Sequence, residues 1–264
     1  MFLSFEQVEK RFGTAPENEF EVFSDIDLEI GENQFVSILG PSGCGKSTLL
    51  SMVAGLEDIS AGSIKLEGEE TDEPGTDRGM VFQQPSLFPW LTVRENVMFP
   101  LKKKLSKREA QERADHFLKM VHLSKSKSSY TYELSGGMQQ RVAIARALAM
   151  DPKVLLMDEP FGALDEQTRH ILHRELLSIW EDTKKTILFV THSIQESIKL
   201  SDRVIVMGTR PGRIIADFPV DIPRPRERDD ERVIKLEKQV MELLEKEINK
   251  VLKEELDNES VPTS

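Results

Sequence analysis

Eight residues near the amino terminus decide the fold: GPSGCGKS, at positions 40 to 47. They match the pattern G-x-x-x-x-G-K-[ST], in which glycines let backbone N–H groups converge on phosphate oxygens. A short apolar run at residues 34–39 predicts a strand before this loop, and residues 46–54 predict a helix after it. This order of strand, loop and helix indicates an α/β protein that binds nucleotide phosphates at a helix N-terminus.

The side chains of the loop suit phosphate and metal binding. We expect Lys46 to reach the β- and γ-phosphates and Ser47 to ligate Mg²⁺, with Thr48 offering a further hydroxyl. The rest of the loop surrounds the phosphates with backbone groups: Gly40, Pro41, Ser42, Gly43, Cys44 and Gly45. Cys44 is either a small filler or a reactive thiol with a lowered pKa, and the filler is favoured because phosphoryl transfer needs no nucleophilic side chain.

A second strand ends in two carboxylates, Asp158 and Glu159. The apolar residues 154–157 predict a strand buried on both faces, and open α/β sheets present ligands at the carboxyl ends of such strands. We expect Asp158 to hold Mg²⁺ through water and Glu159 to accept a proton from, or orient, the attacking water. The alternative is that the two acids are solvated residues at the start of a helix. This interpretation is less favoured because the chain also contains a phosphate-binding loop.

Composition and charge bound the class of protein. The 264 residues are 39% hydrophobic, which is enough for a buried core, and the formal charge is −11. This charge argues against a broad basic face for nucleic acid or anionic lipid but allows a local anion pocket. The sequence holds no apolar run of the roughly 18 residues that span a membrane, no signal-peptide layout at its start and only one cysteine. These features predict a cytoplasmic globular protein without nucleic acid as a partner.

The chain on either side of the loop alternates strands and helices. Residues 20–30 and 63–66 predict strands near the N-terminus. From residue 105 the pattern becomes helical, opened by a capping box that starts at Ser106, which indicates an all-helical insert. Apolar runs at 154–157 and 186–190, separated by a helical stretch at 166–180, form a βαβ alternation.

The C-terminal part predicts an extended linker at residues 222–226 and one charged amphipathic helix at residues 232–256. Its apolar stripe consists of Val233, Leu236, Val240, Leu244, Ile248 and Val251. These positions recur every 3.6 residues rather than every 3.5, which argues against a long coiled coil. Packing on its own domain is favoured, and a dimer or regulatory contact stays open.

The stretch LSGGMQQR at residues 134–141 leads into a predicted helix at residues 139–150, so its serine and two glycines come just before that helix. A serine N-cap explains Ser135 but not the two glycines that follow it. Taken with the two motifs above, this stretch resembles the signature motif of ATP-binding cassette (ABC) ATPases. The resemblance runs from about residue 2 to residue 220, which is most of the chain.

In that family the signature motif is a second anion-binding helix start. The N–H groups of Gly136 and Gly137 would close over an ATP that is bound at Lys46 of the other subunit, so the resemblance implies a homodimer around two ATP molecules. The commonest form of the motif has Gln where this chain has Met138. A polar contact to the nucleotide is then either missing or made by Gln139.

Four further residues fall on family motifs in the expected order. Gln83 would touch Mg²⁺ or the lytic water, and Asp165 would meet the opposite subunit. His192 matches the histidine that hydrogen-bonds the γ-phosphate. Phe12 would stack on adenine, although an aromatic residue near a terminus is as often part of the core.

The resemblance also implies the architecture. The fold would be α/β, with a P-loop (RecA-like) core sheet, an N-terminal antiparallel β subdomain and an inserted α-helical subdomain at about residues 92–150. The ATPase domain would span residues 1–220, and residues 221–264 would form the linker and the C-terminal helix.

Residues 84–91 suggest what the ATPase drives. Leu87, Phe88 and Trp90 are unusually apolar for a loop. They either anchor the loop in the subunit's own core or receive a helix of a membrane permease near residues 83–91, and docking is favoured. The chain most resembles the ATPases of nitrate, sulfonate and taurine importers, which implies a subunit at the cytoplasmic face of the membrane and, indirectly, a substrate-binding protein.

Several alternatives remain at this stage. Bicarbonate or a thiamine precursor would also suit an importer, because this subunit would not touch the cargo. A soluble ABC ATPase without a permease would carry two cassettes or a long coiled-coil insert, and this chain has neither. A P-loop kinase or GTPase does not explain residues 134–141, and a non-hydrolysing sensor does not explain Glu159 and His192.

Overall fold

The computed structural model describes residues 1–13 and 18–259, with side chains up to residue 250. The chain divides into two compact units. The first consists of residues 1–73 and 189–264, and the second of residues 74–188. Strand β8 (Thr186–Thr191) contains the point at which the chain passes from the second unit back into the first.

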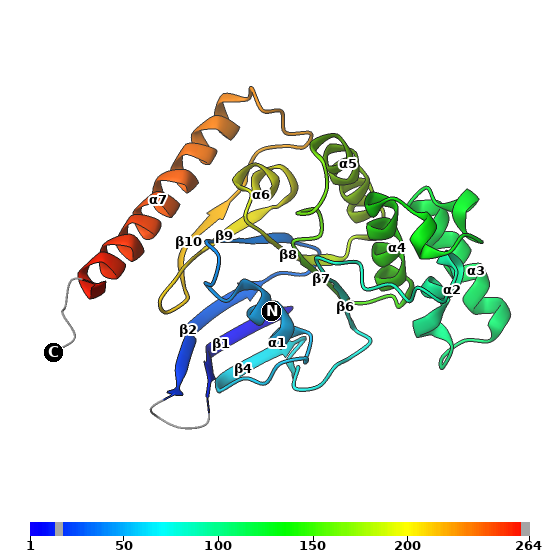
Figure 1. Ribbon diagram of the computed structural model, residues 1–264, viewed down its shortest axis with the longest axis horizontal. Coiled ribbons are helices and arrows are strands. Elements are labelled where there is room, and N and C mark those ends of the chain that lie inside the picture. The colour runs from blue at the N-terminus through cyan, green and yellow to red at the C-terminus, as the bar shows by residue number, and fades with distance from the viewer. Residues whose placement is uncertain (14–17, 260–264) are drawn as a thin grey trace. The chain divides into compact units, whose positions relative to one another are not determined.

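The first unit begins with an antiparallel sheet in the order β2-β1-β4-β5, drawn in blue and cyan in Figure 1. The strands are β1 (Leu3–Phe12), β2 (Phe20–Ile30), β4 (Ala61–Leu66) and β5 (Glu69–Glu70). Leu3 pairs with Ile30 on one side and with Leu66 on the other, and all three side chains are buried. Side chains that are paired across neighbouring strands lie on the same face, so these three residues contribute to one apolar face of the sheet.

The first unit also contains parallel strands. β3 (Phe35–Leu39) pairs in parallel with β9 (Arg203–Gly208), and β10 (Arg213–Pro219) adds an antiparallel edge to β9. Every residue of β3 is buried, as expected for a strand covered on both faces. Helices α1 (Lys46–Val53) and α6 (Ile194–Leu200) belong to this unit.

The second unit combines two parallel strands with helices. β6 (Arg78–Val81) pairs with β7 (Val154–Asp158). The helices are α2 (Val93–Met98), η2 (Phe99–Leu101), α3 (Lys107–Met120), η3 (Ser124–Ser126), η4 (Thr131–Glu133), α4 (Gly136–Ala149) and α5 (Glu166–Thr183). The capping box expected at Ser106 is present, because Ser106 Oγ accepts from Glu109 N and the Glu109 carboxylate accepts from Ser106 N.

One sequence prediction about these elements is wrong. The helix expected from residue 139 begins at Gly136, so both glycines lie in its first turn rather than before it. Glycine is a poor helix former in a helix interior, and this lowered the sequence signal at the start of the helix. Ser135 is the N-cap, as predicted, and its hydroxyl accepts from Met138 N at 3.4 Å.

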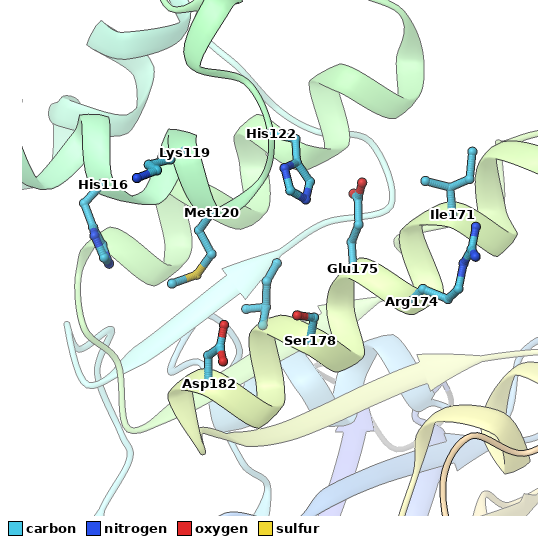
Figure 2. Close-up of a pocket in the computed structure, with 10 residues that line it drawn as sticks. His116, Lys119, Met120, His122, Ile171, Arg174, Glu175, Ser178 and Asp182 are labelled. Carbon is cyan, nitrogen blue, oxygen red and sulfur yellow. The ribbon is translucent and has the colours of Figure 1, made fainter.

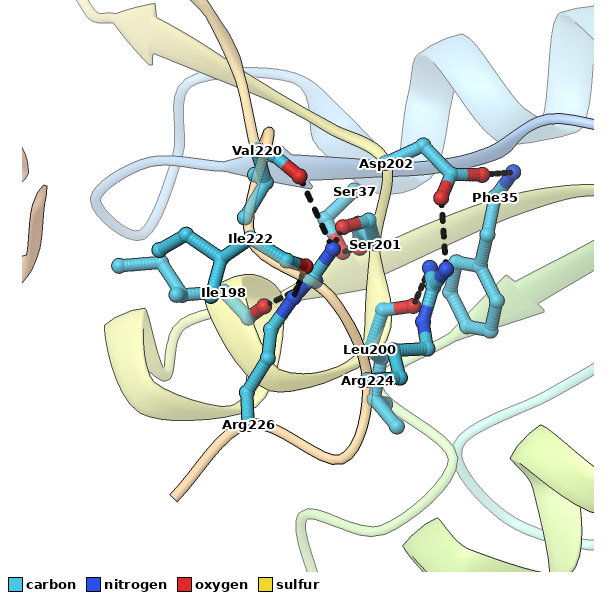
Figure 3. Close-up of polar contacts among 10 residues, drawn as sticks. All are labelled: Phe35, Ser37, Ile198, Leu200, Ser201, Asp202, Val220, Ile222, Arg224 and Arg226. Carbon is cyan, nitrogen blue, oxygen red and sulfur yellow. Dashed lines mark hydrogen bonds and ion pairs between the residues drawn. The ribbon is translucent and has the colours of Figure 1, made fainter. Parts of the chain in front are cut away.

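Two arginines attach the linker to the first unit (Figure 3). Arg226 is buried and donates to the carbonyls of Ile198 and Ser201 at 2.5 Å each, at the end of α6. Arg224 donates to Leu200 O at 2.6 Å and pairs with Asp202 at 2.8 Å. Burial lowers the pKa of Arg226 to about 10, which still leaves it charged at neutral pH. The linker therefore caps the C-terminal carbonyls of α6.

Helix α7 (Glu231–Glu259) packs on the first unit with Val233, Leu236 and Val240, which share a cluster with residues of β9 and α6. This finding favours packing on its own domain. Ile248 was expected on the same stripe, but its side chain is 44% exposed. Glu247 takes the buried position, where it accepts from Thr209 N at 3.1 Å and pairs with Arg213 at 2.9 Å. The predicted Val251 lies beyond the described side chains.

Candidate active site

The phosphate loop of the first unit is shaped by glycines with positive φ. Gly43 has φ +81° and Gly45 has φ +91°. A methyl group on Gly45 would lie 2.7 Å from Phe23 Cδ1 and 2.8 Å from Val22 Cγ1, so only glycine fits there. Gly45 is also the N-cap of α1, and no side chain caps this helix. This helix start, which carries no side-chain cap, is where the sequence motif predicts the phosphates to bind.

Lys46 lies inside this loop with only 6% of its surface exposed. Its Nζ donates to Gly40 O and to Pro41 O, both at 2.9 Å. Two neutral carbonyls satisfy an ammonium group less well than phosphate oxygens, because hydrogen bonds between two charged groups are shorter and stronger. The loop therefore holds Lys46 in place next to the expected phosphate position.

Cys44 is fully buried, and burial raises the pKa of its thiol. A methyl group on Gly40 would lie 2.8 Å from Cys44 Sγ, so the sulfur fills the space beneath the loop. A reactive thiol would need exposure and a lowered pKa. Both observations support the filler interpretation.

The acidic pair lies in the second unit, at the end of β7. Asp158 is the last residue of the strand, and Glu159 follows with φ +41°, a conformation that is uncommon for residues other than glycine. A tight turn holds this geometry, because Gly162 N donates to Glu159 O at 3.1 Å. A methyl group on Gly162 would lie 3.6 Å from Gln83 Nε2 and 3.7 Å from Glu159 Oε2. The structure thus brings Gln83 and Glu159 to one place.

The two signature glycines have different surroundings. A methyl group on Gly137 would lie 2.7 Å from Thr168 Cγ2, so the packing of α4 on α5 explains this glycine. A methyl group on Gly136 would meet only Leu164 Cδ2, at an ordinary 3.5 Å, and Gly136 is exposed. The protein's own packing does not require a glycine at position 136. The prediction that a phosphate approaches the backbone at this helix start would give a reason for the glycine.

Met138 and Gln139 differ in what they can offer a nucleotide. The amide of Gln139 donates to Thr131 O at 3.0 Å and to Leu134 O at 3.4 Å, in the segment before α4. In this structure Gln139 therefore stabilises the entry to the helix. For Gln139 to make the polar contact to the nucleotide that Met138 cannot make, these hydrogen bonds would have to break.

Acidic residues are distributed unevenly among the helix starts. The first turns of five α-helices each carry a glutamate: Glu95, Glu109, Glu166, Glu196 and Glu231. Among the α-helices of the described chain, only α1 and α4 lack an acid there. Acids at a helix start stabilise the helix but repel anions. The two helix starts predicted to bind phosphate are thus the two without this repulsion.

His192 lies in the first unit, between β8 and α6, and two neighbours fix the backbone around it. The Thr191 hydroxyl donates to the Glu196 carboxylate and accepts from Ser193 N at 3.1 Å. Sequence reasoning missed Glu196 as a supporting residue. The signal was present, because Ser193 and Glu196 have the same S-x-x-E spacing that marked the helix at Ser106.

Asp165 and Phe12 lie at the surface. Asp165 is the N-cap of α5 and accepts from Thr168 N at 3.0 Å, and hydrogen bonds from Thr168 lower the pKa of its carboxyl group. Phe12 is 43% exposed at the end of β1, with Lys10 Nζ 4.5 Å from its ring centroid. The exposure removes the core alternative for Phe12 and leaves a ring face for stacking.

Each unit holds part of the predicted set. The first unit contains the loop, His192 and Phe12, and the second contains the acidic pair, Gln83, Asp165 and the signature residues. A pocket of about 630 Å³ in the second unit, between α3 and α5, contains none of them (Figure 2). It includes Glu175, which pairs with Arg141 of α4 at 2.9 Å. This pair supports the packing of α4 on α5.

The predicted magnesium ligands suit that ion in their chemistry. Ser47, Gln83 and Asp158 would supply a hydroxyl, an amide and a carboxylate oxygen, and Mg²⁺ binds few protein oxygens together with phosphates and water. Among the described residues there is no cluster of three or more His, Cys, Asp or Glu side chains that could hold a metal without other ligands. The donor set therefore fits a metal that arrives with a nucleotide.

Comparison with known proteins decides the family. The sequence model of the ABC transporter family matches residues 23–162, which include the phosphate loop, the signature stretch and the acidic pair. The chain belongs to the ABC transporter family. The cassette is 51% identical over 237 residues to an uncharacterised ABC transporter ATP-binding protein of Methanocaldococcus jannaschii, with 89% of each chain covered.

Named relatives include importer subunits. The cassette is 49% identical to a taurine import ATP-binding protein of Rhizobium johnstonii, over 86% of this chain and 87% of that protein. It is 47% identical to a bicarbonate transport ATP-binding protein of Synechococcus elongatus, over 87% of this chain but only 35% of that longer protein.

A solved structure supports both the fold and the reaction. A dimeric ATP-binding cassette in a post-hydrolysis state, bound to ADP and Pi, matches 84% of this chain and 100% of its own, with TM-score 0.73 and 34% identity. The α/β cassette fold and ATPase activity predicted from the sequence are confirmed. In the described part of the chain, no helix combines the length and apolar character needed to cross a bilayer.

Proposed function

We propose that this ABC ATPase hydrolyses ATP for an importer. It forms a homodimer around two ATP molecules and drives a membrane permease for a small anion such as nitrate, a sulfonate or taurine. One observation carries the proposal: a single chain has two acid-free helix starts, α1 behind the phosphate loop and α4 behind Ser135. One would bind the phosphates of its own ATP, and the other would bind the γ-phosphate of the partner's ATP.

The chemistry follows from the residues of each unit. Lys46 and the N–H groups of α1 hold the β- and γ-phosphates, and His192 donates a hydrogen bond to the γ-phosphate. Glu159, with Gln83 beside it, orients a water and accepts its proton as the water oxygen attacks phosphorus and the bond to ADP breaks. Ser47, Gln83 and Asp158 would hold Mg²⁺, which would supply positive charge to the phosphate oxygens. Closure and reopening of the dimer would transmit this cycle to the permease.

The segment at residues 84–91 supports permease docking, because side chains from other segments hydrogen-bond its backbone and fix its conformation. Asn96 is fully buried, and its amide donates to Phe88 O, Leu91 O and Thr92 O while its oxygen accepts from Phe88 N. Arg146 donates to Ser86 O at 2.9 Å and to Pro85 O at 3.1 Å. The loop thus keeps its shape without burying all of its apolar side chains.

Trp90 is 69% exposed, and Phe99 is 45% exposed. The Phe88 ring contacts both, with centroid distances of 5.4 Å to Trp90 and 4.4 Å to Phe99. A groove of about 200 Å³ borders this aromatic group and includes Met80 and Met150. Exposed aromatic rings beside a groove that includes methionines are typical of a site that receives an apolar helix face.

The permease contact can be tested with Trp90→Ala. We expect the tagged parent chain to recover a multi-span permease from its native membranes, and Trp90→Ala to recover at least tenfold less while its ATPase rate stays within twofold. Phe20→Ala is the matched control, since Phe20 is 62% exposed in the first unit. Recovery of no membrane protein by the parent, or equal recovery by Trp90→Ala, would contradict the docking assignment.

The cargo is proposed from the named relatives and from the chemistry that their cargoes share. Taurine carries a sulfonate group and bicarbonate is an anion, so relatives of nearly equal similarity share an anionic group in the cargo but differ in the molecule. Nitrate is a further small anion of this kind. A thiamine precursor would change the cargo class without changing this subunit. The proposal also includes a substrate-binding protein and a peripheral position at the cytoplasmic face, which follow from a permease partner.

The composite site predicts opposite behaviour for the two signature glycines. Gly136→Ala should leave the melting temperature unchanged or raise it, since its methyl group has room, but should weaken ATP-dependent dimerisation at least tenfold. Gly137→Ala should lower stability by about 1 to 3 kcal/mol, because its methyl group overpacks against Thr168. Thermal unfolding and sedimentation in MgATP measure both. Normal dimerisation of Gly136→Ala would remove the ligand-based reason for that glycine.

A further inference from the structure

Positive charge is concentrated in one part of this acidic chain. Residues 94–127 contain ten Lys or Arg and four Asp or Glu, a net charge of +6, whereas the whole chain carries −11. This segment contains most of α2, all of α3 and the turn after them. A local excess of this size attracts anions to one region even when the whole protein repels them.

Part of this charge surrounds a concave pocket of about 600 Å³ in the second unit. Four basic side chains line it: Arg94, Lys102, Lys107 and Lys127. The lining also includes the apolar residues Met98, Leu105 and Ala110, of which Met98 and Ala110 are buried. The volume falls within the range of small-molecule sites. None of the residues assigned to ATP binding contributes to this pocket.

The basic groups differ in how far they are neutralised. Arg94 and Lys127 share one carboxylate, Asp115, at 2.7 Å and 3.1 Å, so these three groups keep one net positive charge. Lys102 and Lys107 pair with no carboxylate among the described residues. Lys102 Nζ lies 5.4 Å from the ring centroid of Phe99, and an aromatic ring attracts a cation without neutralising it.

The one acid of the pocket lining is already in use. Glu95 accepts from Thr92 N and Thr92 Oγ1 at 2.8 Å each, in the capping box of α2. These hydrogen bonds are the main reason that its pKa is lowered, and the charges of Lys102 and Lys107 add to the effect. Glu95 therefore stays ionised and offsets one of the two lysine charges. Together with the single positive charge kept by Arg94, Lys127 and Asp115, the pocket retains a net positive charge of two.

We propose that this pocket binds a small organic anion: a carboxylate, sulfonate or phosphate carried on an apolar body. The anionic group would pair with Lys102 and Lys107, and the apolar body would contact the half-buried Leu105 and the apolar floor formed by Met98 and Ala110. An inorganic ion would make no use of the apolar part of the lining, and a neutral apolar molecule would leave both ammonium groups unpaired. The same chemistry describes a free metabolite-like anion and the headgroup region of an anionic lipid.

Calorimetric titration of the full chain with 1-octanesulfonate tests the site. We expect saturable 1:1 binding that Lys102→Gln/Lys107→Gln weakens at least tenfold. The control Lys103→Gln/Lys125→Gln removes the same charge from exposed residues of the same segment outside the pocket, and should stay within twofold of the parent. Octyl glucoside and sodium sulfate should each bind at least tenfold more weakly than octanesulfonate, because each offers only half of the required chemistry.

A second variant tests the apolar half without changing the charge. Gln111 is exposed and lines the pocket, so the indole of Gln111→Trp should occupy the space and block octanesulfonate. Flotation with phosphatidylcholine vesicles, with and without 30% phosphatidylglycerol, separates the two sources of the anion. Phosphatidylglycerol-dependent flotation of the parent chain that is lost in the Lys102/Lys107 variant indicates a lipid. No phosphatidylglycerol-dependent flotation of the parent chain indicates a free anion. No binding of octanesulfonate, or equal losses in both double variants, would overturn the proposal.

Discussion

Glu159→Gln is expected to lower steady-state ATP hydrolysis by a factor of about 10² to 10⁴, the usual contribution of a positioned general base. Glu159 leaves β7 with a positive φ and approaches Gln83 at Gly162, so glutamine would keep its shape while losing the ability to accept a proton. ATP binding should persist, and the dimer should accumulate because hydrolysis no longer reopens it. Phosphate release and sizing in MgATP measure the two effects.

The control for this experiment is Glu181→Gln, an exposed acid in α5 of the same unit. It should hydrolyse ATP at the parent rate and dimerise as the parent does. Hydrolysis at the parent rate by Glu159→Gln, together with monomers only in MgATP, would show that the base lies elsewhere.

Lys46→Ala should weaken ATP binding at least 100-fold. Two hydrogen bonds to charged phosphate oxygens are lost, each worth about 1.5 to 3 kcal/mol. The nucleotide-free chain should also lose stability, because Lys46 Nζ donates to Gly40 O and Pro41 O inside the loop. Fluorescent ATP-analogue titration and thermal unfolding check the two consequences separately.

Lys65→Ala is the matched control for Lys46→Ala. Lys65 lies in the same unit and pairs with Glu6 at the surface, so its loss removes one positive charge without touching the loop. Its ATP affinity should match that of the parent. An unchanged affinity in Lys46→Ala would mean that the carbonyl contacts of the lysine are purely structural.

The predictable elements were those with strong local signals. The strand at residues 20–30 and the helix that begins at Lys46 have the predicted bounds, or nearly so, because apolar runs and glycine turns delimit them. The start of α4 was placed three residues late, since two glycines oppose helix formation there. Ile248 was assigned to the buried face because hydrophobicity alone could not show that Glu247 finds an arginine and a backbone N–H inside.

Motif spacing named the candidate site residues, but their physical reasons required coordinates. Sequence could not separate Gly136 from Gly137, because the difference depends on Thr168, which lies in another helix. It could not show that Lys46 is held by the loop's own carbonyls, or that Glu196 secures the backbone beside His192. Each of these depends on a contact between segments that turn chemistry and periodicity do not encode.

The arginine caps on α6 set a lower limit for any fragment of this chain that is to keep the first unit intact. A fragment that stops at residue 220 would leave the carbonyls of Ile198, Leu200 and Ser201 without the hydrogen bonds that they accept from Arg224 and Arg226. Unsatisfied carbonyls at that helix end would loosen the segment that begins just after His192. Deleting the tail to simplify crystallisation or assays would therefore alter the unit that contains Lys46 and His192 as well as the periphery of the chain.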